Sequence, residues 1–394
     1  MAHRPTVLVS WEMGGGMGHL AHLGTLMRAL LVHGCRPVGV FRELHHVHHL
    51  IPPCEILAAP VGNAPQAIAP TFVYPQLLFN SGFHRYEELR TRIRSWQTIL
   101  ALTKPDLLIC EHSPTALLAA HCLGVPACTF GTGFLAPPDV WPPVELIPGG
   151  AAESLQWAED YVRELVNRIL AEFGRPPLAR VNELYGRVSR NFLVTFEELD
   201  HFAERRPASR YFGAWSHMGG AIPEWRGGDG PRIYAYLKPC PLLPALIGYL
   251  SRLPNPLLIY APEVHNDALQ RLVRSNVAIA SQPVDMAQAA EQCDVALLNA
   301  THGTTSAMFL AGKPCFHVPI YLEQAILANR LMSRGAAMGI EQTQTAELLE
   351  SRLSAFLATN TCAAIAANLA DRYRNFDLQQ EVTAVAEEIH QMAV

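Results

Sequence analysis

A glycine-rich loop near the start of the chain has the composition of an anion-binding or active-site loop. The segment Glu12–His19 reads EMGGGMGH and follows the apolar run Thr6–Ser10. Glycines let backbone amides approach a ligand closely, and the N-terminus of a helix after such a loop favours negative charge. The spacing does not complete a G-x-G-x-x-G motif, so we do not expect a dinucleotide site. A loop that only turns tightly is the alternative.

A second loop has the composition expected of a diphosphate site. Asn299–Ser306 reads NATHGTTS, and it lies between the apolar run Val295–Leu298 and the helical stretch Ala307–Lys313. Small hydroxyl residues and a glycine at the start of a helix offer N–H and O–H donors without bulk. The loop differs from a P-loop because it contains neither the lysine nor a magnesium-binding carboxylate. A capped helix without a ligand would contain similar residues.

A histidine run offers metal-ligating side chains at helical spacing. The segment His45–His49 reads HHVHH, so pairs of histidines share helix faces. Among nearby residues only Glu43 is placed to complete a closed zinc site. We therefore expect no metal site here and interpret the run as a solvated or cleft-lining helix.

These loops require a scaffold that presents them at one edge. Short β-branched runs alternate with glycine, proline or serine breaks and longer helical patterns, which is typical of βα units in a parallel sheet. We predict an α/β fold with two parallel-sheet domains, in which ligands bind at the carboxyl ends of strands. The expected strands are Thr6–Ser10, Val38–Phe41, Leu107–Cys110, Val125–Phe130, Asn191–Thr195, Arg232–Leu237, Pro256–Tyr260, Val277–Ala280, Val295–Leu298 and Cys315–Pro319.

Helical patterns fill most of the segments between these strands. One long irregular stretch, Phe134–Gly150, has four prolines within APPDVWPP, and we predict a surface loop there. The clearest expected helices are Leu20–His33, Pro114–Leu123, Glu153–Gly186, Pro244–Leu253, Met286–Gln292 and Cys362–Met392.

Composition excludes several classes of function. The chain has 394 residues, 16% of them charged, and a net charge of −5, so no basic field exists to hold nucleic acid or an anionic membrane. Mean hydropathy is +0.11, yet no stretch approaches the roughly 20 apolar residues of a membrane span. The N-terminus lacks the pattern of a signal peptide, and nine scattered cysteines without C-x-x-C suggest reduced thiols. We expect a cytoplasmic protein.

The order of motifs in the second half resembles the donor region of family 1 glycosyltransferases and their bacterial relatives, the antibiotic and macrolide glycosyltransferases. In that family a glycine-rich loop and helix precede a G-x-P, a strand ending in proline, an acid-glutamine pair and an asparagine. Gly18–His19 before a helix matches the family's landmark in the first half. The matching residues in the second half are Gly303–Ser306, Gly312–Pro314, Cys315–Pro319, Glu323–Gln324, Asn329 and Arg334–Gly335.

The resemblance implies a GT-B fold, with two Rossmann-like domains that face each other across a cleft. It divides the chain into an acceptor-binding domain at 1–215, a linker at 216–230 and a nucleotide-sugar-binding domain at 231–375. The remaining segment, 376–394, is expected to be a helix that packs back on the first domain.

The resemblance also assigns donor-binding residues. Gly303–Ser306 would hold the diphosphate, with Asn299 or His302 also reaching a phosphate, and Glu323–Gln324 would bind sugar hydroxyls. The stretch Ser281–Val284 takes the place of a segment that often has a tryptophan against the base. The expected donor-binding residues are Gly16, Gly18, Pro283, Val284, Asn299, His302, Gly303, Thr304, Thr305, Ser306, Glu323 and Gln324.

Catalysis would require one general base to take the proton of the acceptor, with a carboxylate behind it to orient the ring. The resemblance places the base at His19 and its carboxylate at Glu111. His22 replaces a proline common in the family and is the alternative base. Aromatic side chains would line an apolar acceptor pocket, although single aromatics are more often core residues. The expected acceptor-binding residues are Phe83, Phe134 and Trp141.

The implied activity is an inverting transfer that requires no metal or other cofactor. A sugar moves from a UDP- or TDP-sugar to a small-molecule or peptide acceptor, without nucleic acid, and the oligomeric state is open. The alternatives are a GT-B epimerase or hydrolase of nucleotide sugars, and an inactive homologue that binds a nucleotide sugar or acts as a helper subunit.

Overall fold

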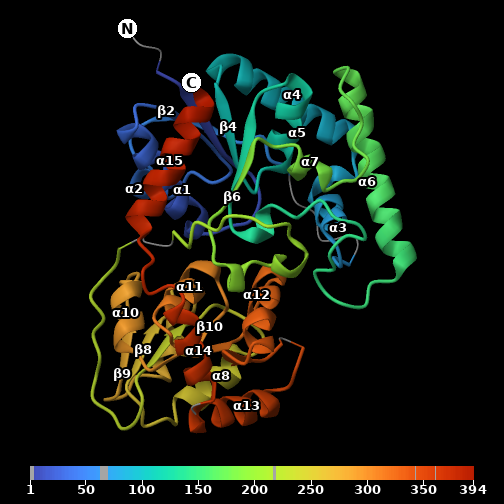
Figure 1. Ribbon diagram of the computed structural model, residues 1–394. Helices are drawn as coiled ribbons and strands as arrows, with labels where there is room; N and C mark the ends of the chain where they lie inside the picture. The colour runs from blue at the N-terminus through green and yellow to red at the C-terminus, as the bar shows by residue number, and fades with distance from the viewer. Residues whose placement is uncertain (1–3, 63–69, 216–218, 342, 360) are drawn as a thin grey trace. The chain divides into compact units, whose positions relative to one another are not determined.

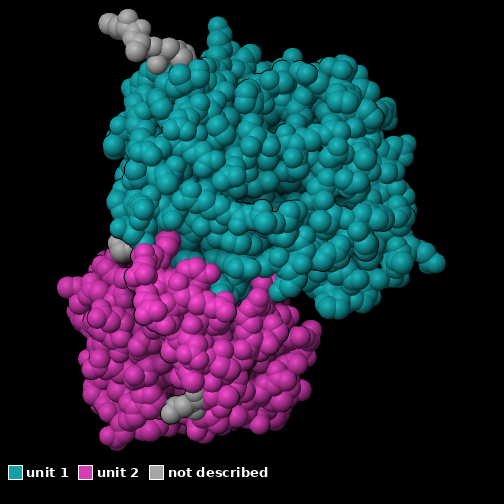
Figure 2. Space-filling model, viewed as in Figure 1, with its two compact units in different colours: residues 1–215, 377–394 teal, residues 216–376 magenta. Residues whose placement is uncertain are grey.

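The computed structural model describes residues 4–62, 70–215, 219–341, 343–359 and 361–394. The chain divides into two compact units, coloured separately in Figure 2. Unit 1 comprises residues 1–215 and 377–394, and unit 2 comprises residues 216–376. Unit 1 thus contains both ends of the chain, with unit 2 inserted before its last helix.

Unit 1 is built on a six-stranded sheet in which every strand pair is parallel (Figure 1). The central strands consist almost entirely of buried residues, as expected for a parallel sheet covered on both faces. In sheet order the strands are β3 (Glu55–Ala58), β2 (Arg36–Phe41), β1 (Thr6–Trp11), β4 (Leu107–Glu111), β5 (Ala127–Gly131) and β6 (Arg190–Leu193).

The C-terminal helix α15 (Leu378–Ala393) lies beside α1 (Met17–Val32) in unit 1 (Figure 1). Val385 and Ile389 of α15 are fully buried in the same apolar cluster as Leu23 of α1. The last helix therefore completes the core of the first unit. The other helices of unit 1 are α2 (Val47–Leu50), α3 (Tyr74–Leu78), α4 (Tyr86–Thr103), α5 (Pro114–Leu123), α6 (Ala152–Glu172) and α7 (Glu183–Gly186).

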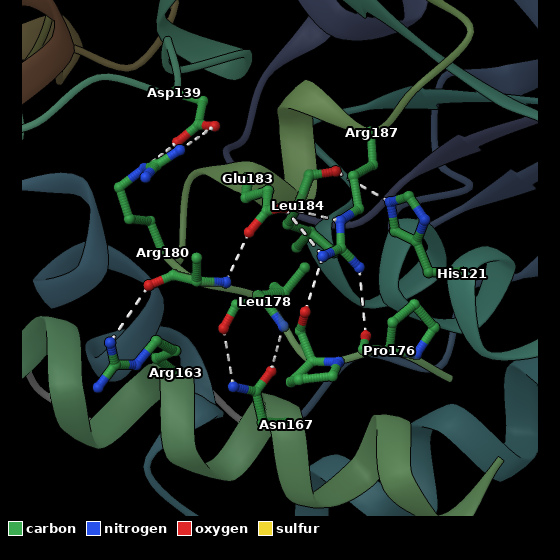
Figure 3. Close-up of polar contacts among 12 residues, drawn as sticks. His121, Asp139, Arg163, Asn167, Pro176, Leu178, Arg180, Glu183, Leu184 and Arg187 are labelled. Carbon is green, nitrogen blue, oxygen red and sulfur yellow. Dashed lines mark hydrogen bonds and ion pairs between the residues drawn. The ribbon is translucent and has the colours of Figure 1, made fainter. Parts of the chain in front are cut away.

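The helix predicted over Glu153–Gly186 is wrong in its second half, because α6 ends at Glu172. Gly174 takes a left-handed φ of 65°, and Pro176 and Pro177 follow. The segment after the break is held against α6 by Asn167, whose amide donates to Leu178 O at 2.9 Å and accepts from Leu178 N at 2.7 Å (Figure 3).

The predicted surface loop Phe134–Gly150 is also wrong in its first part. Residues 133–138 are buried, and the Phe134 ring packs against Tyr74, with centroids 6.1 Å apart. Arg206 donates to Ala136 O at 2.8 Å and to Gly133 O at 3.0 Å, while it pairs with buried Asp200. The prolines prevented regular structure here, but the segment is covered by these contacts.

Unit 2 contains a second six-stranded sheet, and its strand pairs are also parallel (Figure 1). In sheet order the strands are β12 (Ala337–Gly339), β11 (Cys315–His317), β10 (Val295–Leu298), β7 (Ile233–Tyr236), β8 (Leu257–Tyr260) and β9 (Val277–Ala280). Its helices are α8 (Leu243–Leu250), α9 (Asn266–Gln270), α10 (Met286–Gln292), α11 (His302–Leu310), α12 (Leu322–Ser333), α13 (Ala346–Ala358) and α14 (Thr361–Asp371).

The single helix predicted over Cys362–Met392 is two helices in two different units. α14 ends at Asp371 in unit 2, and Asp377 caps α15 in unit 1 by accepting from Gln380 N at 3.1 Å. No single helix among the described residues is long and apolar enough to span a membrane. The pair α13 and α14 reaches that length and composition only when joined across a bend of 66°.

The predicted linker at 216–230 begins with residues 216–218, which lie outside the described residues. From 219 to 230 the chain forms neither helix nor strand. Ala221 forms an isolated bridge with Val284, since its amide donates to Pro283 O at 2.8 Å. The described linker residues thus run against unit 2.

Candidate active site

In unit 1 the predicted catalytic residues lie where β1 and β4 end side by side. Their register pairs Trp11 with Glu111, the last residue of each strand. The order of strands reverses between these two neighbours, since β2 follows on one side and β5 on the other. Such a switch point leaves a crevice at the carboxyl ends of the strands, which is where open α/β sheets bind ligands.

Two histidines of α1 converge on the Glu111 carboxylate. His19 Nδ1 lies 2.6 Å from Glu111 Oε1, and His22 Nε2 lies 3.2 Å from the same oxygen. Both histidines face Glu111 because residues three apart share a helix face. Trp11 stacks on His19 with ring centroids 4.8 Å apart, which fixes the plane of that imidazole. The structure therefore brings together the predicted pair His19 and Glu111, and adds His22.

The carboxylate between these histidines is charged. Glu111 is fully buried, which would raise its pKa, but the adjacent His19 and His22 outweigh burial and lower the pKa of Glu111 to about 2. Its second oxygen, Oε2, is buried with no hydrogen-bond partner among the described residues. A buried anion in contact with two imidazoles orients both rings and favours a proton on the nitrogens that face it.

Gly14 determines how His19 can lie. It has a φ of 83°, and a Cβ added there would lie 2.6 Å from His19 Nε2, the ring nitrogen remote from Glu111. Only glycine accepts both this backbone conformation and this approach. The sequence showed a glycine-rich loop, but it did not distinguish Gly14 from Gly16 and Gly18, which have nothing within 4 Å of an added Cβ.

Two further residues next to the ends of β1 and β4 were not expected from the sequence. Glu12 is buried, accepts from Thr115 N at 2.9 Å and Ala116 N at 3.2 Å, and so caps α5 behind the strands. His112 directly follows Glu111 with a φ of 43°, which is uncommon for a residue other than glycine. Burial lowers the pKa of His112 to about 4, so it is neutral at pH 7.

Unit 2 has its own group of predicted site residues, at the carboxyl edge of its sheet. The stretches that contain the predicted donor residues follow β9, β10 and β11, so they share one edge of this parallel sheet. α11 starts at His302, two residues after Ala300, which has a φ of 56°, and its first-turn donors include Gly303 and Thr304. Three buried polar atoms here have no partner among the described residues: Asn299 Oδ1, Thr301 Oγ1 and Thr305 Oγ1.

Other predicted donor residues already have partners inside unit 2. The hydroxyl of buried Ser306 donates to His302 O at 2.7 Å, and Gln324 Oε1 accepts from Ile320 N at 2.8 Å at the start of α12. Val284 is buried beside the linker, next to half-buried Pro283. Ligand contacts of these residues, and of Glu323 beside Gln324, stay predictions.

Two residues at this edge were not expected from the sequence. Lys238 follows the central strand β7, its side chain is 18% exposed, and its ammonium lies 2.9 Å from Glu263 Oε1. His317 ends β11, and neither of its ring nitrogens has a partner among the described residues. Burial lowers the pKa of His317 to about 4. Lys238 could have been found in the sequence, because a lysine directly after the expected strand YAYL lies at its carboxyl end. His317 could not, because a histidine within an apolar strand does not indicate a function.

The three predicted acceptor residues occupy different environments. Phe83 is fully buried, with Arg92 5.9 Å from its ring centroid, and Phe134 is buried against Tyr74. Trp141 is half exposed and lines a cavity of about 220 Å³ with Arg163 and Arg180. Of the three, Trp141 alone offers a large side-chain surface to a ligand, and an acceptor role for any of them stays a prediction.

Comparison with known proteins identifies the fold. No known protein-family profile matches the sequence, and no curated protein matches it. Solved structures match it along its whole length. The calicheamicin glycosyltransferase CalG4 superposes with a TM-score of 0.71 and 16% identity, over 100% of this chain and 98% of that chain.

Two other matching structures contain a nucleotide according to their descriptions. Glycosyltransferase VinC in complex with DTDP has a TM-score of 0.68 and 15% identity, over 98% of this chain and 99% of that one. The spinosyn rhamnosyltransferase SpnG complexed with thymidine diphosphate has a TM-score of 0.62 and 16% identity, over 99% and 100%. The two Rossmann-like units with their six-stranded parallel sheets form a GT-B fold, which confirms the predicted fold class.

Proposed function

We propose that this protein is a glycosyltransferase that moves a sugar, with inversion and without a metal, from a nucleoside-diphosphate sugar to an acceptor hydroxyl. The observation that carries the proposal is the contact of 2.6 Å between His19 Nδ1 and the buried Glu111 carboxylate. With the proton held on Nδ1, Nε2 is the nitrogen of His19 that carries the lone pair and would act as the base.

The chemistry follows from this arrangement. His19 Nε2 takes the proton of the acceptor hydroxyl while the oxygen bonds to the anomeric carbon and the bond to the diphosphate oxygen breaks. Attack on the face opposite the leaving group inverts that carbon. Glu111 stabilises the imidazolium that forms, and its low pKa keeps it from taking the proton itself. Glu111 is thus a positioning residue, and His19 touches the reacting atoms.

The donor would bind at the carboxyl edge of unit 2. The N-terminus of α11 favours the negative charge of a diphosphate leaving group, and the unpartnered hydroxyls of Thr301 and Thr305 lie in the same turn. Thymidine diphosphate stands in the descriptions of the VinC and SpnG structures and of a third match, SsfS6 of Streptomyces sp. SF2575. We therefore favour a TDP-sugar over a UDP-sugar.

The acceptor would bind to unit 1, near His19 Nε2. A further SpnG structure is described as complexed with spinosyn aglycone, and another match is the glycosyltransferase of kitacinnamycin. These relatives in fold support a small-molecule acceptor rather than a peptide for this chain. No disulfide joins the nine cysteines among the described residues, which supports a reducing compartment such as the cytoplasm.

The test compares His19→Gln with His22→Gln. Transfer is measured as TDP release from TDP-sugars with a panel of macrocyclic aglycones, and TDP binding is measured by calorimetry. Removal of the base should lower turnover about 100-fold or more in His19→Gln, with TDP affinity unchanged. His22→Gln should retain most of the turnover, because His22 serves as the second partner of Glu111.

Three outcomes would contradict the proposal. A larger loss in His22→Gln would make His22 the base. Conversion of the donor sugar without any acceptor would indicate an epimerase or hydrolase. Tight TDP binding by the wild-type protein without turnover of any donor would indicate an inactive binding protein.

A further inference from the structure

Three metal-ligating side chains meet at one point in unit 1. His19, His22 and Glu111 place one ligand atom each within 4.8 Å of one another, and no other group of three or more such residues was found within the described ranges. They come from one helical turn and from the end of the neighbouring strand, so the backbone that carries them is regular. The group contains no histidine of the HHVHH run, where we expected no metal site.

The distances suit a small tetrahedral ion. Zinc bonds of about 2.0–2.2 Å to nitrogen and oxygen place tetrahedral ligand atoms roughly 3.3 Å apart. His22 Nε2 is already 3.2 Å from Glu111 Oε1, and His19 Nδ1, at 2.6 Å, needs to withdraw by roughly 0.7 Å. The surface side of the cluster stays accessible, because the side chains of His19 and His22 are 16% and 15% exposed.

The donor set also suits zinc in charge and chemistry. Two imidazoles and one carboxylate match the His₂Glu ligand set of open zinc sites, in which a fourth position is left for water. Glu111 supplies one negative charge and a buried second oxygen without a partner among the described residues. Magnesium and calcium prefer an all-oxygen set, whereas zinc and neighbouring transition metals accept imidazole.

We propose that His19, His22 and Glu111 form a binding site for Zn²⁺ or a similar divalent transition-metal ion, and that the bound ion reversibly blocks the base. The site itself depends only on the geometry above. The inhibition rests on the proposed glycosyltransferase function.

The inhibition follows from the two nitrogens of the His19 ring. A neutral imidazole has one N–H and one lone pair. When the ion takes the lone pair at His19 Nδ1, the single proton must lie on Nε2, next to Gly14. His19 Nε2 then has no lone pair to accept the acceptor's proton. Removal of the ion lets the proton return to Nδ1, where Glu111 accepts it, and restores the base.

Binding is tested first without reference to activity. The chelator-treated full chain is titrated with Co²⁺, whose visible absorption reports tetrahedral coordination, and then with Zn²⁺ in competition. We expect one ion per chain and an affinity at least tenfold weaker in His22→Gln. The matched control replaces two exposed histidines of α2, His48→Gln and His49→Gln, and should keep the wild-type affinity.

The result that overturns the site is a wild-type chain that binds no Co²⁺, or a control variant that loses the ion while His22→Gln keeps it. Melting curves of each variant show that an altered affinity is not a loss of fold. In the activity measurements, the transfer rate of each variant with metal is compared with the rate of the same variant without metal.

Added Zn²⁺ should inhibit wild-type transfer, EDTA should restore it, and His22→Gln should require at least tenfold more Zn²⁺ for the same inhibition. Zinc bound at the site without inhibition would overturn the block. If no transfer is found at all, the Co²⁺ titration still decides the metal site, while the proposed function fails on its own.

Discussion

At the scale of single residues, Glu111 acts by sharing one oxygen between two rings. Oε1 contacts His19 Nδ1 at 2.6 Å and His22 Nε2 at 3.2 Å, so the shorter contact binds His19 more strongly. The remaining nitrogen of His19 faces Gly14, and its position depends on the missing side chain at that glycine. The absence of a side chain at Gly14 therefore leaves the space in which the His19 ring lies.

The first prediction concerns Gly14→Ala. The new methyl group would lie 2.6 Å from His19 Nε2, so the ring must move, and turnover should fall at least tenfold. The left-handed φ of 83° adds a loss of stability of about 1–2 kcal/mol. Steady-state kinetics and thermal melting measure the two effects.

Gly34→Ala is the matched control for Gly14→Ala. Gly34 has a similar φ of 80°, follows the same helix, and would have nothing within 4 Å of its Cβ. It should lose comparable stability and keep full turnover. Equal loss of turnover in both variants would mean that backbone strain, not displacement of His19, explains the effect of Gly14→Ala.

The sequence predicted the central pair of the site but not its surroundings. His19 and Glu111 both follow apolar runs that become neighbouring strands, and the family resemblance gave their roles. Gly14 and His112 require knowledge of φ, which a single sequence does not contain. Ser306 shows a second limit of the sequence, since a hydroxyl near a helix start is also able to donate to its own helix, and its role toward a ligand stays a prediction.

At the scale of elements, α15 is the part of the chain whose position sequence order alone would misplace. It follows unit 2 directly, yet Val385 and Ile389 are buried in the core of unit 1. Strand β6 and helix α15 are separated by all of unit 2, so unit 1 is complete only when its last helix has docked.

The second prediction concerns Ile389→Ala. This removes a fully buried side chain and should destabilise unit 1 by about 2–5 kcal/mol. Calorimetry of the full chain should show a lower transition for unit 1 and an unchanged one for unit 2. Val394→Ala, at a position 83% exposed, should leave both unchanged. A shift confined to unit 2 would contradict the packing of α15.

The ten strands expected from the sequence lie within two residues of the observed ones at each end, whereas the short edge strands β3 and β12 were missed and the long helices were predicted poorly. β9 and β10 match their predicted ranges because buried β-branched runs are bounded by polar residues. The helix pattern after Glu153 continued through Pro176–Pro177, where apolar spacing persists although the backbone cannot stay helical. Apolar periodicity reports burial, and an irregular segment can also be buried.

The third prediction concerns the pH dependence of stability that buried His317, at the end of β11, should cause. The pKa of His317 is about 4 in the folded chain and 6.5 when unperturbed, so the unfolded chain binds the proton first as pH falls. Stability of unit 2 should therefore be lost as pH falls from 6.5 to 4, by up to about 1.4 kcal/mol per pH unit from this group. His317→Leu should flatten this dependence.

Calorimetry between pH 4 and 7 checks the His317 prediction. His265→Leu, which replaces an exposed histidine of the same unit, is the control and should keep the wild-type slope. His317→Leu should also melt slightly higher at pH 7, because a buried ring without partners among the described residues is replaced by an apolar side chain. An unchanged slope in His317→Leu would rule out this histidine as the source.

At the scale of the whole molecule, low charge limits how an anionic donor can be held. With a net charge of −5 and 16% charged residues, the chain has no positive field to attract a diphosphate over a distance. Lys238 is a cation at the carboxyl edge of unit 2, and Glu263 already pairs with it. In the proposed function, short-range hydrogen-bond donors at the start of α11 would then supply most of the affinity for the diphosphate.

The last prediction assigns nucleotide binding to one unit. TDP at a hundredfold its dissociation constant should stabilise unit 2 by about 2.7 kcal/mol, which raises its melting temperature by about 2–4 °C and leaves unit 1 unchanged. Thymidine, which lacks the diphosphate, should give a smaller shift. Because helix N–H groups and hydroxyls act at contact distance, the TDP shift in melting temperature should change little between 50 and 500 mM salt. Binding by exposed cations would instead weaken steeply with salt, as expected from a Debye length of about 10 Å at 0.1 M. A shift of the unit 1 transition, or a loss of the shift at high salt, would contradict this view of how the donor is held.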